Sequence, residues 1–373
     1  MTPPPTLADD GAGTLDAVAD TFRRHVAFPD SHAADLMALW CAHTWASSSF
    51  YVTPRVIVSS AEPGSGKTRV LEVAALFCHT PKLTANTSPA ALFRRIAASA
   101  ENGALPPTVL LDETDAVFGR GSTPGTEELR GMLNAGYKAG ATIDRCEGDA
   151  SKMTVREFPV FAPVMLAGIA GNMPDTITTR AVTIPLRKRK PTEHVEPFRE
   201  RDASGRALPV RELLAAWVDK VTPTITTATP TMPKGVVDRP SEVWEALLAI
   251  ADAAGGHWPD TARAACRYYV LEQKDSGDLS EGVELLRDIR DVFREKGVDR
   301  MHSEPLAAAL RSLPEAPWKE PATLLDQRRL STTLRRYSVT SRQLRIGHEN
   351  KKGYTTDGDG GLADAWERYL PPS

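Results

Sequence analysis

The stretch from Arg55 to Thr68 constrains the fold more than any other part of the chain. Its first half, RVIVSS at 55–60, is rich in β-branched residues and predicts a buried strand. Its second half places two glycines ahead of a Lys-Thr pair, and residues 69–77 then show the apolar spacing of a helix. A strand, a glycine-bearing turn and a helix in this order are typical of a phosphate-binding loop.

Each residue type in this loop has a physical role. Glycines at 64 and 66 let backbone N–H groups approach phosphate oxygens, where a side chain would block them. Lys67 offers a point charge to the outer phosphates, and the hydroxyl of Thr68 suits Mg²⁺. Ala61 replaces the pattern's first glycine, at a position that makes the turn, and the alternative interpretation is a chance Gly-Lys-Thr in a surface loop. The predicted cofactors are ATP and Mg²⁺, and the predicted cofactor-binding residues of the loop are Glu62, Pro63, Gly64, Ser65, Gly66, Lys67, Thr68 and Arg69.

A second apolar strand, TVLL at 108–111, ends in Asp112 and Glu113. An apolar run that ends in acids is a weak signal alone, but this one follows the loop and a helix in the order of a parallel β-α-β arrangement. Asp112 could then hold the Mg²⁺ shell together with Thr68, and Glu113 could polarise the attacking water. We therefore predict an ATPase in which Asp112 and Thr68 serve the metal and Glu113 directs hydrolysis.

The chain then alternates between further strands and turns. Residues 141–156 alternate on both sides of a Gly-Asp turn, which is a hairpin signal. A buried strand at 163–169 ends near Asn172, and a last strand at 181–186 follows Arg180. A basic run at 187–190 closes this part of the chain.

This succession resembles the AAA+ and superfamily-3 helicase branch of phosphate-loop ATPases. The resemblance implies an α/β fold with a P-loop ASCE (AAA+-like) parallel sheet core. With the segments that follow, the predicted fold is this core, an α-helical lid region and a C-terminal winged-helix-like domain. It implies catalytic roles for Asn172, as a sensor of the γ-phosphate, and for Arg180, which would reach a neighbouring subunit's nucleotide, beside Glu113 and Lys67. It also implies that Lys152, near the hairpin tip, faces DNA in a ring pore. The plain alternatives are a turn cap for Asn172, a solvated strand-start residue for Arg180 and an ordinary turn lysine for Lys152.

The region after the core carries a second resemblance. A strongly apolar helix begins near Asp238 and Arg239 and stops at Gly255-Gly256, and another helix follows at 261–272. This stretch resembles domain of unknown function 3631, found in actinobacterial and actinophage proteins beside primase or helicase modules. The resemblance implies that Arg239, in a lid, is a second phosphate-sensing, cofactor-binding arginine. Its alternative is a residue at the start of a helix with no such role.

The last segment has the pattern of a winged helix-turn-helix, with three amphipathic helices followed by a hairpin. Between Gln327 and Thr356 there are eight basic residues and one acidic residue, on a chain whose formal net charge is −3. A local excess of this kind is the pattern expected for contact with a phosphate backbone, although a charge run can also be a solvated face. The predicted DNA-binding residues are Lys152, Arg328, Arg329, Arg335, Arg336, Arg345, Lys351 and Lys352.

Composition bounds the remaining possibilities. The 373 residues, 41% hydrophobic and 25% charged, suit a soluble globular protein of two or three domains. Four widely spaced cysteines without metal-ligand spacing fit a reducing cytosol, and no apolar run is long enough to span a membrane, so we expect a cytoplasmic protein. The predicted domains are a disordered tail (1–13), a P-loop ATPase domain with a helical lead-in (14–220), a Thr/Pro-rich linker (221–235), a helical lid (236–280) and a winged-helix-like domain (281–373).

Three functional hypotheses follow. The first is an ATP-hydrolysing, Mg-dependent, ring-forming DNA motor, a helicase or translocase in phage or mobile-element replication, which forms a homo-oligomer such as a hexamer. Its partners would be single-stranded or forked DNA and a primase or other replicative protein. The second is an ATPase switch, such as a helicase loader or replication initiator, that binds DNA without unwinding it. The third is a DNA-binding regulator with a degenerate nucleotide site, and the intact Lys-Thr and Asp-Glu pairs argue against it.

Overall fold

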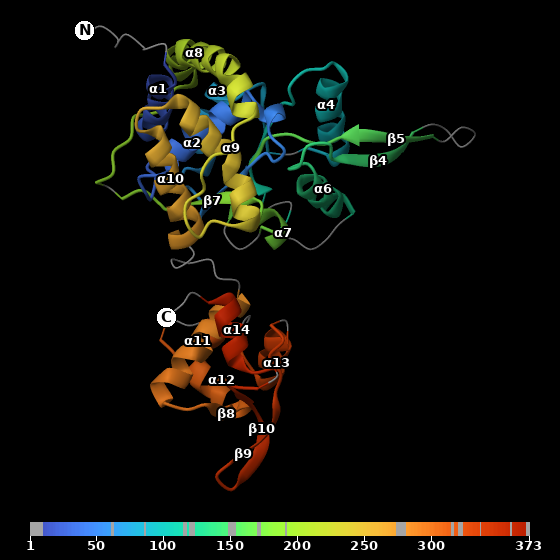
Figure 1. The fold of residues 1–373 in the computed structure, drawn as a ribbon, viewed down its shortest axis with the longest axis vertical. Coiled ribbons are helices and arrows are strands. Elements are labelled where there is room, and N and C mark those ends of the chain that lie inside the picture. Colours follow the sequence, from blue (N-terminus) through green and yellow to red (C-terminus); the bar gives the residue numbers. More distant parts are fainter. Residues whose placement is uncertain are drawn as a thin grey trace. The chain divides into compact units, whose positions relative to one another are not determined.

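The structure is a computed structural model that describes most of the chain as two compact units, Met1–Gln273 and Lys274–Ser373 (Figure 1). Each unit is considered by itself. The described residues are 10–60, 63–85, 87–114, 118, 124–147, 154–169, 173–190, 192–273, 281–314, 317–319, 324–335, 337–358 and 360–370.

A five-stranded, fully parallel sheet forms the centre of the first unit, in the order β2-β3-β6-β1-β7. The strands are β1 (Arg55–Ser60), β2 (Pro81–Thr84), β3 (Thr108–Leu111), β6 (Val164–Ile169) and β7 (Ala181–Leu186). The register aligns Ser60 with Ile169 on one side and with Leu186 on the other. Because the strands are parallel, the segments that follow β1, β3 and β6 all leave the same edge of the sheet. The expected parallel α/β core is confirmed.

Helices cover both faces of this sheet, and the strand side chains alternate between two apolar clusters as the pleat requires. Val56 and Val58 join the cluster that contains α1, α2 and α3, whereas Ile57 joins the cluster that contains α4 and α6. The helices of these two layers are α1 (Gly11–His25), α2 (Ala33–Thr44), α3 (Lys67–Phe77), α4 (Pro89–Glu101) and α6 (Pro124–Ala135). A short turn, η1 (Ser47–Ser49), leads into β1, and α7 (Asp175–Thr178) leads into β7.

The expected hairpin is confirmed as a separate antiparallel pair, β4 (Thr142–Glu147) with β5 (Thr154–Pro159). It extends away from the parallel sheet, beside α4 and α6 (Figure 1). Its turn, with Lys152, lies outside the described residues.

The helices expected as a lid pack into the same core as α3. These are α9 (Asp238–Ala254), α10 (Trp258–Arg267) and the π-turn Tyr268–Glu272, and with α1, α2, α3 and α8 they form one apolar cluster. The reason is the composition of α2, whose twelve residues are all buried, so that it needs apolar neighbours on every side. The division at Gln273 therefore differs from the expected start of a lid domain at 236.

The expected linker at 221–235 is partly wrong, because helix α8 (Glu200–Thr226) continues to residue 226. Pro223 removes one backbone donor inside the helix. The hydroxyls of Thr222 and Thr226 donate to the carbonyls of Val218 and Thr222, each at 2.7 Å, and Ile225 is buried. The threonine and proline content thus predicts an extended segment, whereas the burial of Ile225 keeps the first part of that segment helical.

The second unit has a core of its own and a three-stranded antiparallel sheet in the order β8-β10-β9. Its elements are α11 (Glu281–Lys296), β8 (Arg300–His302), α12 (Ser303–Arg311), a 3₁₀ turn (Pro317–Lys319), α13 (Gln327–Arg335), β9 (Arg342–Ile346), β10 (Glu349–Thr355) and α14 (Leu362–Tyr369). The three helices and the hairpin match expectation, whereas the three-residue strand β8 and helix α14 are additions. In the core the indole of Trp318 donates to Asp288 Oδ2 at 2.7 Å. Among the described helices, none combines the length and apolarity that crossing a bilayer requires.

His43 on α2 makes the first unit sensitive to acid. Its ring is fully buried, and neither ring nitrogen has a hydrogen-bond partner among the described residues. Burial, and then the charge of Arg55, lower the pKa of His43 to about 3. Because the unfolded chain binds the proton more tightly, stability is complete above the unfolded pKa of about 6.5 and falls as the pH drops from there toward 3.

We therefore expect the free energy of unfolding of the first unit to fall by about 2 kcal/mol between pH 7 and pH 5 through this residue alone. Urea unfolding at both pH values, for the parent and for His43→Leu, measures this contribution. The variant should lose less stability over this range, and equal losses in the two proteins would contradict the assignment.

Candidate active site

The loop between β1 and α3 has the backbone conformation that its glycines were expected to supply. Gly64 and Gly66 have φ angles of +77° and +92°, a region that residues with a Cβ rarely adopt. Both glycines are exposed, as is Pro63, whereas Ser65 is half-buried and Glu62 lies outside the described residues. Lys67 is the first residue of α3, and its Nζ donates to Ser60 Oγ at 2.6 Å. The start of α3 is thus open toward the carboxyl edge of the sheet.

The loop and the acidic strand end converge at this edge. Thr68 Oγ1 donates to Asp112 Oδ2 at 2.7 Å, although the two residues are 44 positions apart in the chain. Strand order accounts for the contact, because only β6 separates β1 from β3 and all three strands point the same way. The sequence-predicted pair is therefore brought together.

Glu113, the next residue, has a backbone conformation that is unusual for a residue other than glycine. Its φ angle is +52°, its own N–H donates to Asp112 Oδ1 at 2.8 Å, and its side chain is exposed. The next residue, Thr114, is buried and donates its hydroxyl to the carbonyl of Ala167 at 2.9 Å, which ties the segment to β6. A non-glycine residue in this region is strained by about 1–3 kcal/mol, so the surrounding contacts must hold it there.

The donor chemistry at this edge suits Mg²⁺, which prefers hydroxyl, carboxylate and water oxygens and keeps several ligands from a bound phosphate. Thr68 and Asp112 provide the hydroxyl and the carboxylate. The described residues contain no group of three or more His, Cys, Asp or Glu side chains that could hold a metal by themselves. A cation here would therefore need a phosphate and water to complete its shell, and Lys67 and the exposed loop N–H groups could hold that phosphate.

Arg69 lies on α3 but is engaged elsewhere. Its Nη1 is 3.1 Å from Glu72 Oε2, and its guanidinium lies 4.3 Å above the ring of Phe198. The sensor residue expected at Asn172 lies outside the described residues and stays a prediction.

Arg180 and Arg239 lie at the amino edge of the sheet, where the parallel strands begin, opposite the carboxyl edge that carries the loop. Arg180 directly precedes β7, and its carbonyl accepts the N–H of Arg55, at the start of β1, at 3.2 Å. Arg239 donates from Nη1 to Thr179 Oγ1 at 3.2 Å. The length of β1 at about 3.3 Å per residue separates this edge from the loop by roughly 16 Å.

The structure thus places both arginines at the end of the sheet opposite Lys67 of their own chain. Arg180 lies there because the parallel register sets a residue before β7 beside the start of β1. The phosphate-sensing role expected of Arg239 stays a prediction. Two further residues were not expected from the sequence. Ser60 accepts a hydrogen bond from Lys67. Arg55 is buried, although a basic residue at the start of a strand is normally expected to be solvated.

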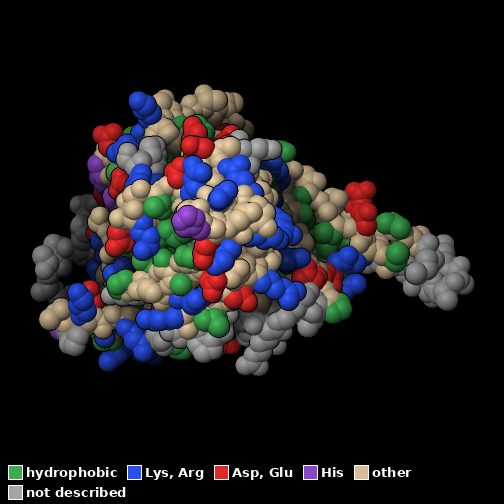
Figure 2. Space-filling model, turned by 90° about the horizontal axis from the view of Figure 1, so that it is seen from below, with side chains coloured by type: hydrophobic (Ala, Val, Ile, Leu, Met, Phe, Trp, Pro, Cys, Tyr) green, Lys and Arg blue, Asp and Glu red, His purple; other side chains and the backbone are tan. Residues whose placement is uncertain are grey.

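The second unit presents its excess of basic residues mainly to solvent. Arg328, Arg335, Arg345, Lys351 and Lys352 are exposed, and Arg336 lies outside the described residues. Lys351 is paired with Glu349 at 3.0 Å, whereas Arg328, Arg345 and Lys352 form no ion pair with a described residue. On the face of the molecule in Figure 2, Lys and Arg side chains are numerous and acidic side chains lie among them. The described basic residues of the stretch are thus largely open to a large anionic partner.

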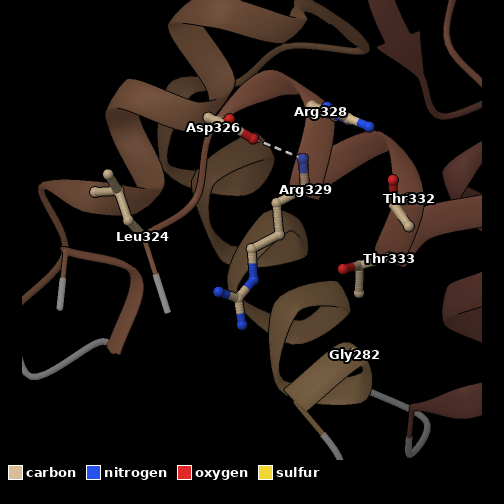
Figure 3. A pocket seen from close by; sticks show the side chains of 7 residues that line it. All are labelled: Gly282, Leu324, Asp326, Arg328, Arg329, Thr332 and Thr333. Carbon is tan, nitrogen blue, oxygen red and sulfur yellow. Dashed lines mark hydrogen bonds between the residues drawn. The ribbon is translucent and has the colours of Figure 1, made fainter. Parts of the chain in front are cut away.

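Arg329 differs from its neighbours on α13. It is half-buried and extends into a cavity of about 450 Å³ (Figure 3). The backbone N–H of Arg329 donates to Asp326 Oδ1 at 2.6 Å, which caps the start of α13. The cavity is lined by Gly282, Leu324, Asp326, Arg328, Arg329, Thr332 and Thr333.

Comparison with known proteins gives a distant set of structures and a close relative. The apo structure of the NrS-1 C-terminal region is 11% identical with a TM-score of 0.39, over 91% of this chain and 74% of that one. SCCmec type IV Cch, described as an active helicase, is 9% identical with a TM-score of 0.40, over 90% of this chain and 69% of that one. Similarities this remote assign no function.

The relationship in sequence is firmer. Residues 185–369 match a protein family described as protein of unknown function, DUF3631. An uncharacterised 28.9 kDa protein in the xis 5′ region of Saccharopolyspora erythraea is 34% identical over 188 residues, which are 50% of this chain and 69% of that protein. The chain therefore belongs to the same family as this Saccharopolyspora erythraea protein.

Proposed function

We propose that the chain is a Mg²⁺-dependent ATPase that acts on DNA as a ring-forming motor, a helicase or translocase in phage or mobile-element replication. The observation that carries the proposal is the contact between Thr68 and Asp112, with Lys67 and Glu113 at the same sheet edge. In a phosphate-loop ATPase these four residue types have distinct tasks that require one common location.

Each of these residues has a distinct chemical role in the proposal. The loop N–H groups and Lys67 hold the phosphates and offset their negative charge. Bound Mg²⁺ would supply further positive charge at the phosphate oxygens, held by Thr68 and by Asp112. Glu113, exposed and fixed by its strained backbone, orients a water molecule and draws a proton from it.

An arginine from a second copy of the chain completes this site in the proposal. Arg180 and Arg239 both lie at the end of the sheet opposite Lys67, and Arg69 is engaged with Glu72 and Phe198. In a homo-oligomer such as a hexamer, the amino edge of one subunit would face the carboxyl edge of the next. Arg180 would then stabilise charge that develops on the neighbour's phosphate.

The second unit is proposed to be a winged helix-turn-helix that binds DNA. Its order of helices and strands, with α13 followed by the β9–β10 hairpin, is the order of that motif. Exposed basic side chains on α13 and on the hairpin would contact phosphates. A primase or another replicative protein is the proposed protein partner.

ATP binding should depend on Lys67. We expect Lys67→Ala to weaken ATP affinity at least about tenfold, since a charge-assisted hydrogen bond is worth about 1.5–3 kcal/mol. Titration calorimetry with Mg²⁺ and ATP measures this change, with Lys220→Ala, an exposed lysine on α8, as the matched control. Equal affinity in the two variants would contradict the assignment.

The motor activity needs a separate measurement. A forked DNA duplex incubated with the parent chain and ATP should be unwound, and the Lys67→Ala variant should leave it paired. ATP hydrolysis with DNA binding but without strand separation would instead favour the loader or initiator.

A further inference from the structure

Arg55, the first residue of β1, is a buried cation without a carboxylate partner in the part of the chain that the structure describes. Its side chain is 1% exposed. Nη1 donates to the carbonyl of Ala162 and Nη2 to the carbonyl of Leu133 at 3.1 Å, while Nε has no partner among the described residues. Burying a charge without an opposite charge beside it is costly, so stability alone does not explain an arginine here.

The backbone of Arg55 also contacts Arg180. The N–H of Arg55 donates to the carbonyl of Arg180 at 3.2 Å. Burial, and then the charge of Arg180, lower the pKa of Arg55 to about 9. On its other side Arg180 lies 4.9 Å above the ring of Tyr137, and its Nη1 donates to the carbonyl of Thr176.

Arg55 also fixes the support beneath Arg180. Leu133, whose carbonyl it binds, is in the last turn of α6, and Tyr137 follows four residues later. The carbonyl of Tyr137 accepts the N–H of Thr53 at 2.8 Å, and that of Gly136 accepts the N–H of Ala162 at 3.2 Å. The end of α6, the start of β1 and the segment before β6 are thereby joined around one guanidinium.

We propose that Arg55 is a positioning residue for Arg180. It holds the Tyr137 ring in place under Arg180, and this support sets the direction in which the Arg180 guanidinium can face a second copy of the chain. The inference rests on the proposed function, because Arg180 is taken to act on the neighbouring subunit's nucleotide.

The first test compares single variants. Arg55→Met should keep the affinity for ATP within about twofold and the melting temperature equal or higher, while kcat falls at least about tenfold with little change in KM. Arg180→Ala should give the same result, and so should Tyr137→Leu, which removes the ring and leaves Arg55. Arg55→Lys keeps the charge but has a single ammonium group instead of the forked guanidinium. Its kcat should therefore lie between that of the parent and that of Arg55→Met.

The decisive test mixes subunits. Equimolar Arg55→Met and Glu113→Gln subunits should recover ATPase activity, because the Glu113→Gln subunits present an intact Arg180 to the intact Glu113 sites of their partners. Arg55→Met/Glu113→Gln double-variant subunits mixed with Arg55→Met subunits provide the control and should recover nothing.

Three results would overturn the inference. They are weaker ATP binding in both Arg55→Met and Arg55→Lys, full activity in Arg180→Ala, or recovery in mixtures of Arg180→Ala with Glu113→Gln but none with Arg55→Met. A parent chain without ATPase activity would instead reject the proposed function, which separates the two failures.

Discussion

Replacing Glu113 by glutamine is expected to slow ATP hydrolysis at least about a hundredfold and to leave ATP binding intact. Glutamine has nearly the same shape, but it cannot accept the proton of the attacking water. Glu113 is exposed, so the loss of its charge should not disturb the packing around Thr114. Steady-state turnover and nucleotide titration measure the two effects separately, and the variant should accumulate as an ATP-bound oligomer in size-exclusion chromatography.

Glu212→Gln makes the same chemical change on the exposed surface of α8 and should have parental turnover. If Glu113→Gln hydrolyses ATP as fast as this control, Glu113 is not the base. A loss of ATP affinity in Glu113→Gln would point instead to a role in binding.

Removing three exposed cations from the second unit should abolish most of its affinity for DNA. Arg328, Arg345 and Lys352 are suited to this test because none is in an ion pair with a described residue. Each phosphate contact contributes about 0.9 to the slope of log affinity against log salt on duplex DNA. The triple change to glutamine should therefore lower the slope by roughly 2.7 and weaken binding at least about a hundredfold near 0.1 M salt.

The matched control removes the same charge from α11, by Arg287→Gln, Arg294→Gln and Lys296→Gln. These residues lie outside the basic stretch, and Arg287 is paired with Asp288 and Glu284. Fluorescence anisotropy with labelled duplex and single-stranded DNA, over a range of salt, compares the two variants. Equal losses would mean that binding follows net charge and not the helix-and-hairpin surface.

The parts of the site that depend on local pattern could be predicted from sequence. Gly64 and Gly66 adopt the positive φ angles that the motif requires, and Asp112 meets Thr68 because a strand ending in acids belongs at the same edge as the loop. The hairpin and the order of helices in the second unit also follow from alternation and spacing.

Features set by distant contacts could not be predicted in this way. Nothing near Arg239 indicates that it meets Thr179, since the two residues are 60 positions apart and the contact depends on the folded chain. The helical continuation to Thr226 depends on the burial of Ile225 and overrides the threonine and proline pattern. Glu62, Lys152, Asn172 and Arg336 lie outside the described residues, so their roles stay predictions.

The central claim is that the loop before Lys67 and the acids at 112 and 113 enclose one magnesium triphosphate. A crystal structure of the chain with Mg²⁺ and a non-hydrolysable ATP analogue tests it most directly. We expect the metal about 2.1 Å from Thr68 Oγ1, with Asp112 in its shell and Lys67 on the terminal phosphates. A nucleotide bound at any other place, or a metal out of reach of both Thr68 and Asp112, would contradict the account.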